Sequence, residues 1–392
     1  MTRRTVLSAA FLAVTLSGAL AVAADTPPPE FTAAGEARRR EIPLGGDFAP
    51  DPKVPVFVAV GHGGRILLSR DDGATWKQVF FGHPGSDHGG WATNAIGYTG
   101  GVFAVPVGWG GPTSYLASDD GTQWRHLTAG TAKLDRSGDP RLMPMTMSVA
   151  GGKQSFVFSG YMTMAATRDF GKTWNTFSLY SFKNDSRKLV THHIKTRYLG
   201  DSTGRFLAVG EDRAMQNPGF GHLFASDDLS KTWKWLTPKG LNGLKNYSAL
   251  ESNGKVTVLL DKDAANAYRS TDGGETWEGP FPTGGRRATL NVVGSEFWLT
   301  GSPGRASADG KTWRDLPGAV PDGKIVASNT GTLINIDRAR FTVLRSTDSG
   351  KTWAEVYKFE PETKYVHGAQ GLRDVAFGLV RAKPTPGAKA AP

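Results

Sequence analysis

Short apolar runs alternate with glycine-rich turns along most of the chain, in the pattern of β-strands. Residues 56–79 (VFVAVGHGGRILLSRDDGATWKQV) hold an apolar run, a turn, a second apolar run, a polar octet and a final strand. The same order recurs at residues 101–127, 205–236 and 331–356. A further β-like run precedes most units, as at residues 91–99 and 288–293. About four strands per repeat is the makeup of a propeller blade.

A polar octet ending in tryptophan marks each unit. It reads SRDDGATW at residues 69–76, and the other copies end at Trp124, Trp174, Trp233, Trp277, Trp313 and Trp353. We assign its aspartates as Asp71, Asp119, Asp169, Asp228, Asp272 and Asp348. An aspartate in a turn accepts hydrogen bonds from nearby backbone N–H groups, and glycine adopts conformations closed to larger residues. We expect the octet to join the third and fourth strands, with its aspartates forming turns rather than catalysing a reaction.

Two copies depart from this pattern. Ser230 replaces the glycine of the fourth copy, which predicts a strained or rearranged turn. Ala308 replaces the aspartate of the sixth copy, where Asp309 is the expected substitute one residue later.

Seven copies predict an all-β, seven-bladed propeller with four-stranded antiparallel blades. The ring has to close, and residues 365–382 resemble two further strands that would complete the first blade with strands from residues 54–79. Which end of the chain gives which strand stays open. An eighth, incomplete blade is the alternative.

The N-terminus has the features of an export signal. Arg3 and Arg4 precede an apolar stretch, and small residues precede Asp25, so residues 1–24 are predicted to be a cleaved signal peptide. A membrane anchor is the alternative, and the paired arginines also fit a twin-arginine signal. We expect a linker at 25–41, the propeller at 42–381, a disordered tail at 382–392 and a periplasmic or secreted location. No other segment is long and apolar enough to predict a membrane span.

The composition of the chain limits the kinds of functional site that it can hold. The chain has 392 residues, 50 glycines, 11 tryptophans and no cysteine, which excludes disulfides, thiolate metal sites and a cysteine nucleophile. The net charge of +10 forms no basic stripe, so nucleic acid is not an expected partner. Scattered histidines at 88, 192, 193 and 367 lack metal-ligand spacing, and no nucleophile elbow or phosphate loop is present. We predict no metal and no cofactor, and a monomer.

Loops between second and third strands, together with the blade linkers, should open on one face, opposite the octets. Carboxylates, arginines and aromatic residues converge there from several blades, a mixture that suits a sugar. The candidate catalytic residues are Glu211, Asp261 and Asp337, with Asp263 as the alternative to Asp261. The candidate binding residues are Arg213, Arg338, Arg340, Trp109, Tyr161 and His62. The alternative is that these are ordinary hydrophilic loop residues.

The octet resembles the Asp-box (BNR repeat) of sialidases, sortilin-type receptors, xyloglucanases and photosystem II assembly factors. The sialidase resemblance implies a glycoside hydrolase, but the Arg-Ile-Pro motif of sialidases is absent, since Glu41 precedes the Ile42-Pro43 pair. Residues 60–76 are similar in layout to the repeat of the assembly factors, which implies a non-catalytic protein that binds a protein partner. Whether the chain is an enzyme stays open. We expect an exported, sialidase-like propeller that binds glycans and hydrolyses them if it is an enzyme; the alternative is a scaffold for another exported protein.

Overall fold

The computed structural model describes the propeller strands and the turns between many of them. The described residues are 53–61, 64–80, 93–107, 114–126, 146–160, 163–171, 173–178, 191–212, 222–241, 244, 247–301, 303–337, 341–358 and 371–382. The predicted signal peptide, the linker, residues 42–52 and residues 383–392 lie outside them.

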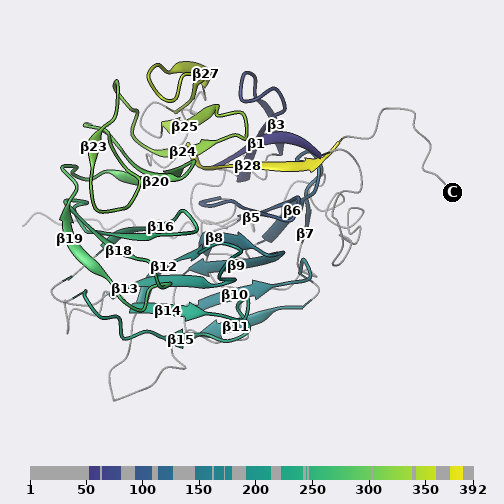
Figure 1. The fold of residues 1–392 in the computed structure, drawn as a ribbon. Coiled ribbons are helices and arrows are strands. Elements are labelled where there is room, and N and C mark those ends of the chain that lie inside the picture. Colours follow the sequence, from purple (N-terminus) through teal and green to yellow (C-terminus); the bar gives the residue numbers. More distant parts are fainter. Residues whose placement is uncertain are drawn as a thin grey trace, which may run out of the picture.

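The described strands form seven four-stranded antiparallel sheets, as the repeat predicts (Figure 1). Each sheet is one blade, and the strands of each run in order from the innermost to the outermost. Blade 1 consists of β28 (Leu372–Arg381), β1 (Lys53–Gly61), β2 (Arg65–Ser69) and β3 (Lys77–Phe80). Blade 2 consists of β4 (Gly97–Thr99), β5 (Val102–Val107), β6 (Ser114–Ser118) and β7 (Arg125–His126). Blade 3 consists of β8 (Thr146–Gly152), β9 (Ser155–Gly160), β10 (Thr163–Thr167) and β11 (Asn175–Ser178). Blade 4 consists of β12 (Thr191–Tyr198), β13 (Phe206–Asp212), β14 (His222–Ser226) and β15 (Lys234–Trp235). Blade 5 consists of β16 (Tyr247–Ser252), β17 (Thr257–Asp261), β18 (Asn266–Ser270) and β19 (Glu278–Pro282). Blade 6 consists of β20 (Thr289–Val293), β21 (Glu296–Thr300), β22 (Arg305–Ser307) and β23 (Arg314–Asp315). Blade 7 consists of β24 (Lys324–Ala327), β25 (Leu333–Asp337), β26 (Thr342–Ser346) and β27 (Ala354–Lys358).

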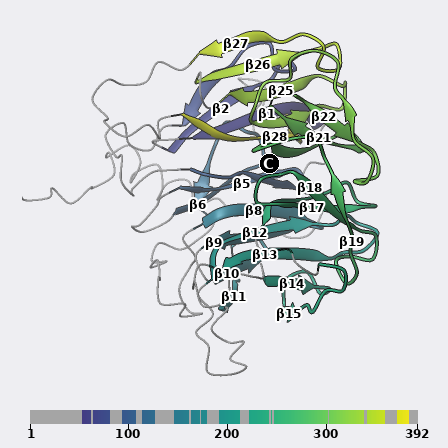
Figure 2. The same cartoon turned by 90° about the vertical axis from the view of Figure 1, so that its left-hand side faces the viewer.

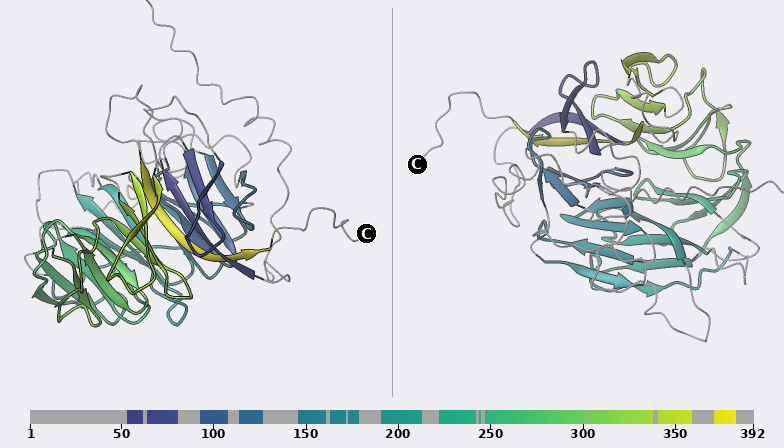
Figure 3. Two further views of the ribbon diagram at one scale, coloured as in Figure 1. Left: turned by 90° about the horizontal axis from the view of Figure 1, so that it is seen from above. Right: turned by 180° about the vertical axis from the view of Figure 1, so that it is seen from behind.

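The C-terminal strand closes the ring. β28 supplies the innermost strand of the first blade and pairs antiparallel with β1, from Lys53 opposite Arg381 to Gly61 opposite Leu372. In both panels of Figure 3 the yellow β28 runs beside the purple β1. β28 also contacts β24 on one side and β4 on the other, so the circuit of inner strands is complete. Figure 2 shows the yellow β28 beside the purple β1 from another side. The described part of residues 365–382 gives this one strand, which settles which terminus contributes it.

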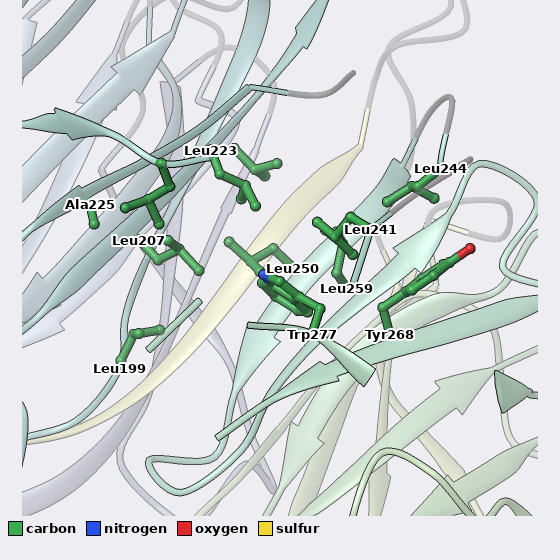
Figure 4. Close-up of a cluster of buried hydrophobic side chains, with 12 residues drawn as sticks. Leu199, Leu207, Leu223, Ala225, Leu241, Leu244, Leu250, Leu259, Tyr268 and Trp277 are labelled. Carbon is green, nitrogen blue, oxygen red and sulfur yellow. The ribbon is translucent and has the colours of Figure 1, made fainter. Parts of the chain in front are cut away.

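The hydrophobic core lies between neighbouring blades rather than within any one of them. Second strands such as β9 are buried along their whole length because both faces of the blade pack against another sheet. Figure 4 shows one such cluster, in which Leu207 of blade 4 packs with Leu250, Leu259 and Trp277 of blade 5. This arrangement explains why the strands read as apolar runs instead of alternating patterns.

The octet joins the third and fourth strands of each blade, as predicted, and its polar groups satisfy one another. In the first copy the Ser69 hydroxyl donates to Asp71 Oδ1 (2.8 Å) and accepts from Gly73 N–H (2.9 Å). The backbone N–H and hydroxyl of Thr75 donate to the two oxygens of Asp71 (2.9 and 2.6 Å). The Trp76 indole N–H donates to the Gly73 carbonyl (3.1 Å). The octet aspartate is therefore a turn-former.

In the second copy the turn is built by Asp120, not by the predicted Asp119. Ser118 Oγ donates to Asp120 Oδ1, which also accepts from the backbone N–H groups of Thr122 (2.7 Å) and Gln123 (2.8 Å). Asp119 instead pairs with Arg381 at the end of β28 (3.3 Å). The copy is one residue shorter between aspartate and tryptophan, which shifts its register.

The sixth copy is short in the same way, and here the prediction for Asp309 is confirmed. Asp309 Oδ1 accepts from the Ser307 hydroxyl (3.0 Å) and from the backbone N–H groups of Lys311 (2.8 Å) and Thr312 (2.9 Å). The exposed Ala308 stands outside this hydrogen-bond set.

The fourth copy is strained rather than rearranged. Ser230 N–H still donates to Ser226 Oγ (2.8 Å), and Thr232 still donates to Asp228. However, Ser230 adopts φ +69°, a left-handed conformation that glycine holds in the matching copies. Its hydroxyl is also buried and, within the part of the chain that the structure describes, has no hydrogen-bond partner.

Candidate functional site

The predicted loop-face residues fall mostly outside the described residues. This holds for His62, Trp109, Tyr161, Arg213, Arg338 and Arg340. Glu211 lies in β13, opposite His192 of β12, but its side chain is not among those described. The predictions for these seven residues therefore stay predictions.

Asp261 and Asp337 lie at the ends of the second strands β17 and β25, at the edge of the blades opposite the octets. The Asp261 carboxylate is engaged by its own turn: Oδ1 accepts from Ala265 N–H and Oδ2 from the Asn266 amide, both at 2.8 Å. Asp337 is buried and pairs across the sheet with Thr342. Their predicted position is correct, and Asp261 has the hydrogen bonding of a turn-former.

A cluster of charged residues instead gathers around the propeller axis, on the innermost strands. The Arg197 guanidinium of β12 donates to Glu251 Oε1 of β16 at 2.8 Å. Lys324 Nζ of β24 lies 3.8 Å from the same oxygen. Burial alone would raise the pKa of Glu251, but Arg197 and Lys324 outweigh it and hold that pKa below its ordinary value. Glu251 is therefore ionised and shared by cations of two other blades.

Asp374 of β28 brings a second carboxyl to this cluster. Its oxygens accept from the backbone N–H groups of Ile96 (3.1 Å) and Val375 (2.9 Å). Burial raises the pKa of Asp374, although the charges of Lys324 and Arg197 act in the opposite direction. The two axial carboxyls thus have pKa values displaced in opposite directions by their surroundings.

Lys195 completes the cluster from β12. Its Nζ donates to the Ser248 carbonyl of β16 at 2.9 Å, and its charge contributes to the lowered pKa of Glu251. We call Lys195, Arg197, Glu251, Lys324 and Asp374 the axial cluster.

A cavity of about 450 Å³ opens beside the axial cluster. It is lined by groups from blades 5, 6, 7 and 1, namely Glu251, Val292, Gly294, Lys324, Ile325, Val326, Ala327, Ser328, Asn329 and Phe377.

The cavity lies toward the octet side of the ring. Gly294 and Asn329 belong to the turns that follow the first strands of blades 6 and 7, and in an antiparallel blade these turns share one edge with the octets. Contacts confirm the placement, because Thr330 of the same turn donates to Asp72 of the first octet (3.1 Å).

The axial cluster is absent from the sequence-based candidates because those were sought in the loops. A usable signal was present: Arg197, Glu251 and Lys324 are charged residues within first strands that also hold apolar residues such as Ile194, Leu250 and Ile325. Sequence alone could not show that strands 54 or more residues apart bring these charges together.

In the described part of the chain, no group of three or more histidine, aspartate or glutamate residues is arranged to hold a metal ion. Nor does any helix among the described residues have the length and apolar character to cross a membrane. What the axial arrangement offers chemically is charge and hydrogen bonding beside an apolar wall.

No known family model and no curated protein matches the sequence. Solved structures do match. The chain is similar to a functionally unknown protein from Desulfotomaculum acetoxidans, with a TM-score of 0.55 and 12% identity over 84% of this chain and 100% of that one. It is also similar to YCF48 from Cyanidioschyzon merolae (TM-score 0.48, 16% identity, 76% and 95% of the two chains) and to a structure described as YCF48 bound to D1 peptide (0.46, 18%, 76% and 90%). The match to the Desulfotomaculum acetoxidans structure, at 12% identity, concerns the fold alone, and the seven four-stranded sheets make the chain a seven-bladed β-propeller.

Proposed function

We propose that this propeller is a binding protein that takes one sugar unit of a glycan into the axial cavity. The observation that carries the proposal is the lining of that cavity: the aromatic ring of Phe377 and the side chains of Val292 and Val326 stand beside the polar groups of Ser328 and Asn329. Small-molecule sites combine an apolar wall with a few polar groups that fix orientation. A volume of about 450 Å³ is enough for such a ligand.

Binding is better supported than hydrolysis. Glycosidases need one carboxyl to donate a proton and a second to act as base or nucleophile. Glu251 is held by Arg197 at 2.8 Å, and both oxygens of Asp261 are engaged by their own turn. Hydrolysis at the loop face by Glu211, Asp261 and Asp337 remains a prediction from the sequence.

The alternative is a scaffold that binds another protein through a flat rim with apolar or charged patches. Within the described residues, Trp235 is the only large hydrophobic side chain that is exposed, at 36%. One such residue does not make an apolar docking face, so on this criterion the described part of the chain favours the cavity.

Export belongs to the same proposal, since it would place the cavity where extracellular glycans are. The test is to express the full chain and sequence the N-terminus of the protein found outside the cytoplasm, where processing near Ala24 is expected. Replacing Arg3 and Arg4 by lysine should block export only if the route is the twin-arginine pathway.

The binding test is a glycan array probed with the full chain and with two variants in which an alanine of blade 7 is replaced by phenylalanine. Ala327→Phe fills the cavity and should abolish the signal, whereas Ala354→Phe, on the exposed strand β27, should leave it unchanged. The absence of any bound glycan would overturn the proposal and direct the search to protein partners.

A further inference from the structure

We infer that the ligand of the axial cavity bears a single carboxylate, which the ammonium group of Lys324 binds. This inference rests on the proposed function, because it names the chemical class of the sugar that enters the same cavity.

The first support is the charge of the axial cluster. Lys195, Arg197 and Lys324 supply three positive charges, and Glu251 and Asp374 supply at most two negative ones. Burial also disfavours the ionised form of Asp374, which enlarges the excess. A partly buried excess of positive charge attracts an anion more strongly than the same charges would in open water.

The second support is the engagement of each cation. Arg197 donates to Glu251 at 2.8 Å, and Lys195 donates to the Ser248 carbonyl at 2.9 Å. In the described part of the chain, the ion-pair contact of Lys324 is with Glu251 at 3.8 Å, beyond hydrogen-bond length. An ammonium group has three donors, so Lys324 keeps donors for a ligand.

The third support is position, because Lys324 is the one cation of the axial cluster that lines the cavity. Its side chain is 24% exposed, so a ligand can reach it. Phe377 and Val326 line the same cavity and provide an apolar surface for the body of the ligand.

Glu251 limits the charge that the ligand can carry. Its carboxylate lies 3.8 Å from Lys324 and would repel a doubly charged phosphate monoester at the same place. A singly charged carboxylate on a sugar ring, as in a hexuronate, meets the Lys324 ammonium with less repulsion. The geometry thus favours acidic over neutral sugars and carboxylates over phosphates.

The test is isothermal titration calorimetry of the full chain with D-glucuronate against D-glucose and with D-galacturonate against D-galactose. The acid should bind at least about tenfold more tightly than its neutral counterpart. Raising the salt concentration should weaken binding of the acids and leave the neutral sugars unchanged, since salt screens charge.

Three variants assign the effect to Lys324. Lys324→Met keeps most of the side-chain length, removes the charge, and should bring the ratio of the two affinities to about one. Lys324→Arg keeps the charge and should retain the preference, which separates recognition from folding. Lys255→Met removes an exposed lysine from the turn after β16 and should change nothing.

The outcomes separate the two proposals. Equal binding of acidic and neutral sugars would overturn the carboxylate inference and leave the proposed function standing. A preference for acids that survives in Lys324→Met would also overturn it. If neither kind of sugar binds, the proposed function itself fails.

Discussion

Two regions of this propeller, the octet turns at the blade edges and the axial cluster, hold their acidic side chains in contrasting ways. In each octet the turn-forming aspartate accepts hydrogen bonds from residues no more than four positions away, as Asp272 does from Ser270 and Thr276. In the axial cluster Glu251 depends on Arg197 of the neighbouring blade, 54 residues earlier, and on Lys324 two blades further round the ring. The octet turn is a local structure repeated seven times, whereas the axial cluster exists only in the closed ring.

The difference has an energetic consequence. Most turn-forming octet carboxylates, such as Asp71 and Asp272, are at least partly exposed, so water can replace a lost partner; Asp120 is the buried exception. Glu251 is 11% exposed, so loss of its partner leaves a carboxylate that water cannot fully solvate. The axial cluster should therefore be more sensitive to the removal of one member than either an exposed ion pair or an octet turn.

The largest expected effect comes from Arg197→Met. It should lower the free energy of unfolding by about 2–4 kcal/mol, since it leaves the enclosed Glu251 carboxylate without its main partner. The matched control is Arg314→Met, because Arg314 and Glu296 form an ion pair of the same 2.8 Å length with the arginine 55% exposed. That change should cost about 0–1 kcal/mol. Urea unfolding measures both.

A double variant sharpens the same comparison. Arg197→Met combined with Glu251→Gln removes both charges and should regain much of the stability lost in Arg197→Met. Equal losses in Arg197→Met and Arg314→Met would show that the axial pair behaves like a surface pair, which would contradict the contrast between enclosed and exposed carboxylates.

The next largest effect on stability is expected from two octet tryptophans of similar burial. Trp277 is 5% exposed and donates its indole N–H to the Gly274 carbonyl at 2.9 Å. Trp124, in a short octet, is 3% exposed, and its indole N–H has no hydrogen-bond partner among the described residues. Trp277→Phe should therefore cost about 1 kcal/mol more than Trp124→Phe, because only the first leaves a buried carbonyl unpaired. Urea unfolding measures the loss of unfolding free energy in both variants. Equal losses would contradict the prediction and show that the indole hydrogen bond of Trp277 adds no stability.

Relief of strain in the fourth octet should give a smaller effect of opposite sign. Ser230→Gly should raise the free energy of unfolding by about 0.5–1 kcal/mol, since glycine adopts φ +69° without strain and removes an unpaired buried hydroxyl. Ser295→Gly is the control, because Ser295 is exposed and its φ is not positive. Thermal unfolding should show a higher midpoint only for Ser230→Gly, and a lower one would mean that the turn is not strained.

The same contrast explains how far the sequence could predict the structure. The octet recurs with its chemistry contained in eight residues, so the blade number, the turn and the roles of Asp71 and Asp309 could be predicted from it. The assignment of Asp119 is wrong because a deletion after the aspartate shifts the short octets, and an aspartate stands at both candidate positions. Glu251 and Lys324 could not be found, since their proximity depends on how the blades pack around the axis.

The smallest expected effect is the response of one octet to acid. Hydrogen bonds from Thr352 and Ser346 lower the pKa of Asp348 to about 2, whereas the ordinary aspartate value is 3.8. Because the folded pKa is the lower one, the contribution of Asp348 to stability is present above pH 3.8 and is lost as the pH falls toward 2. Asp348→Asn should therefore be less stable than the parent chain near neutral pH, and the difference should vanish across this interval. Urea unfolding at a series of pH values tests it, and a difference that persists at pH 2 would show that the Asp348 charge is not what the turn requires.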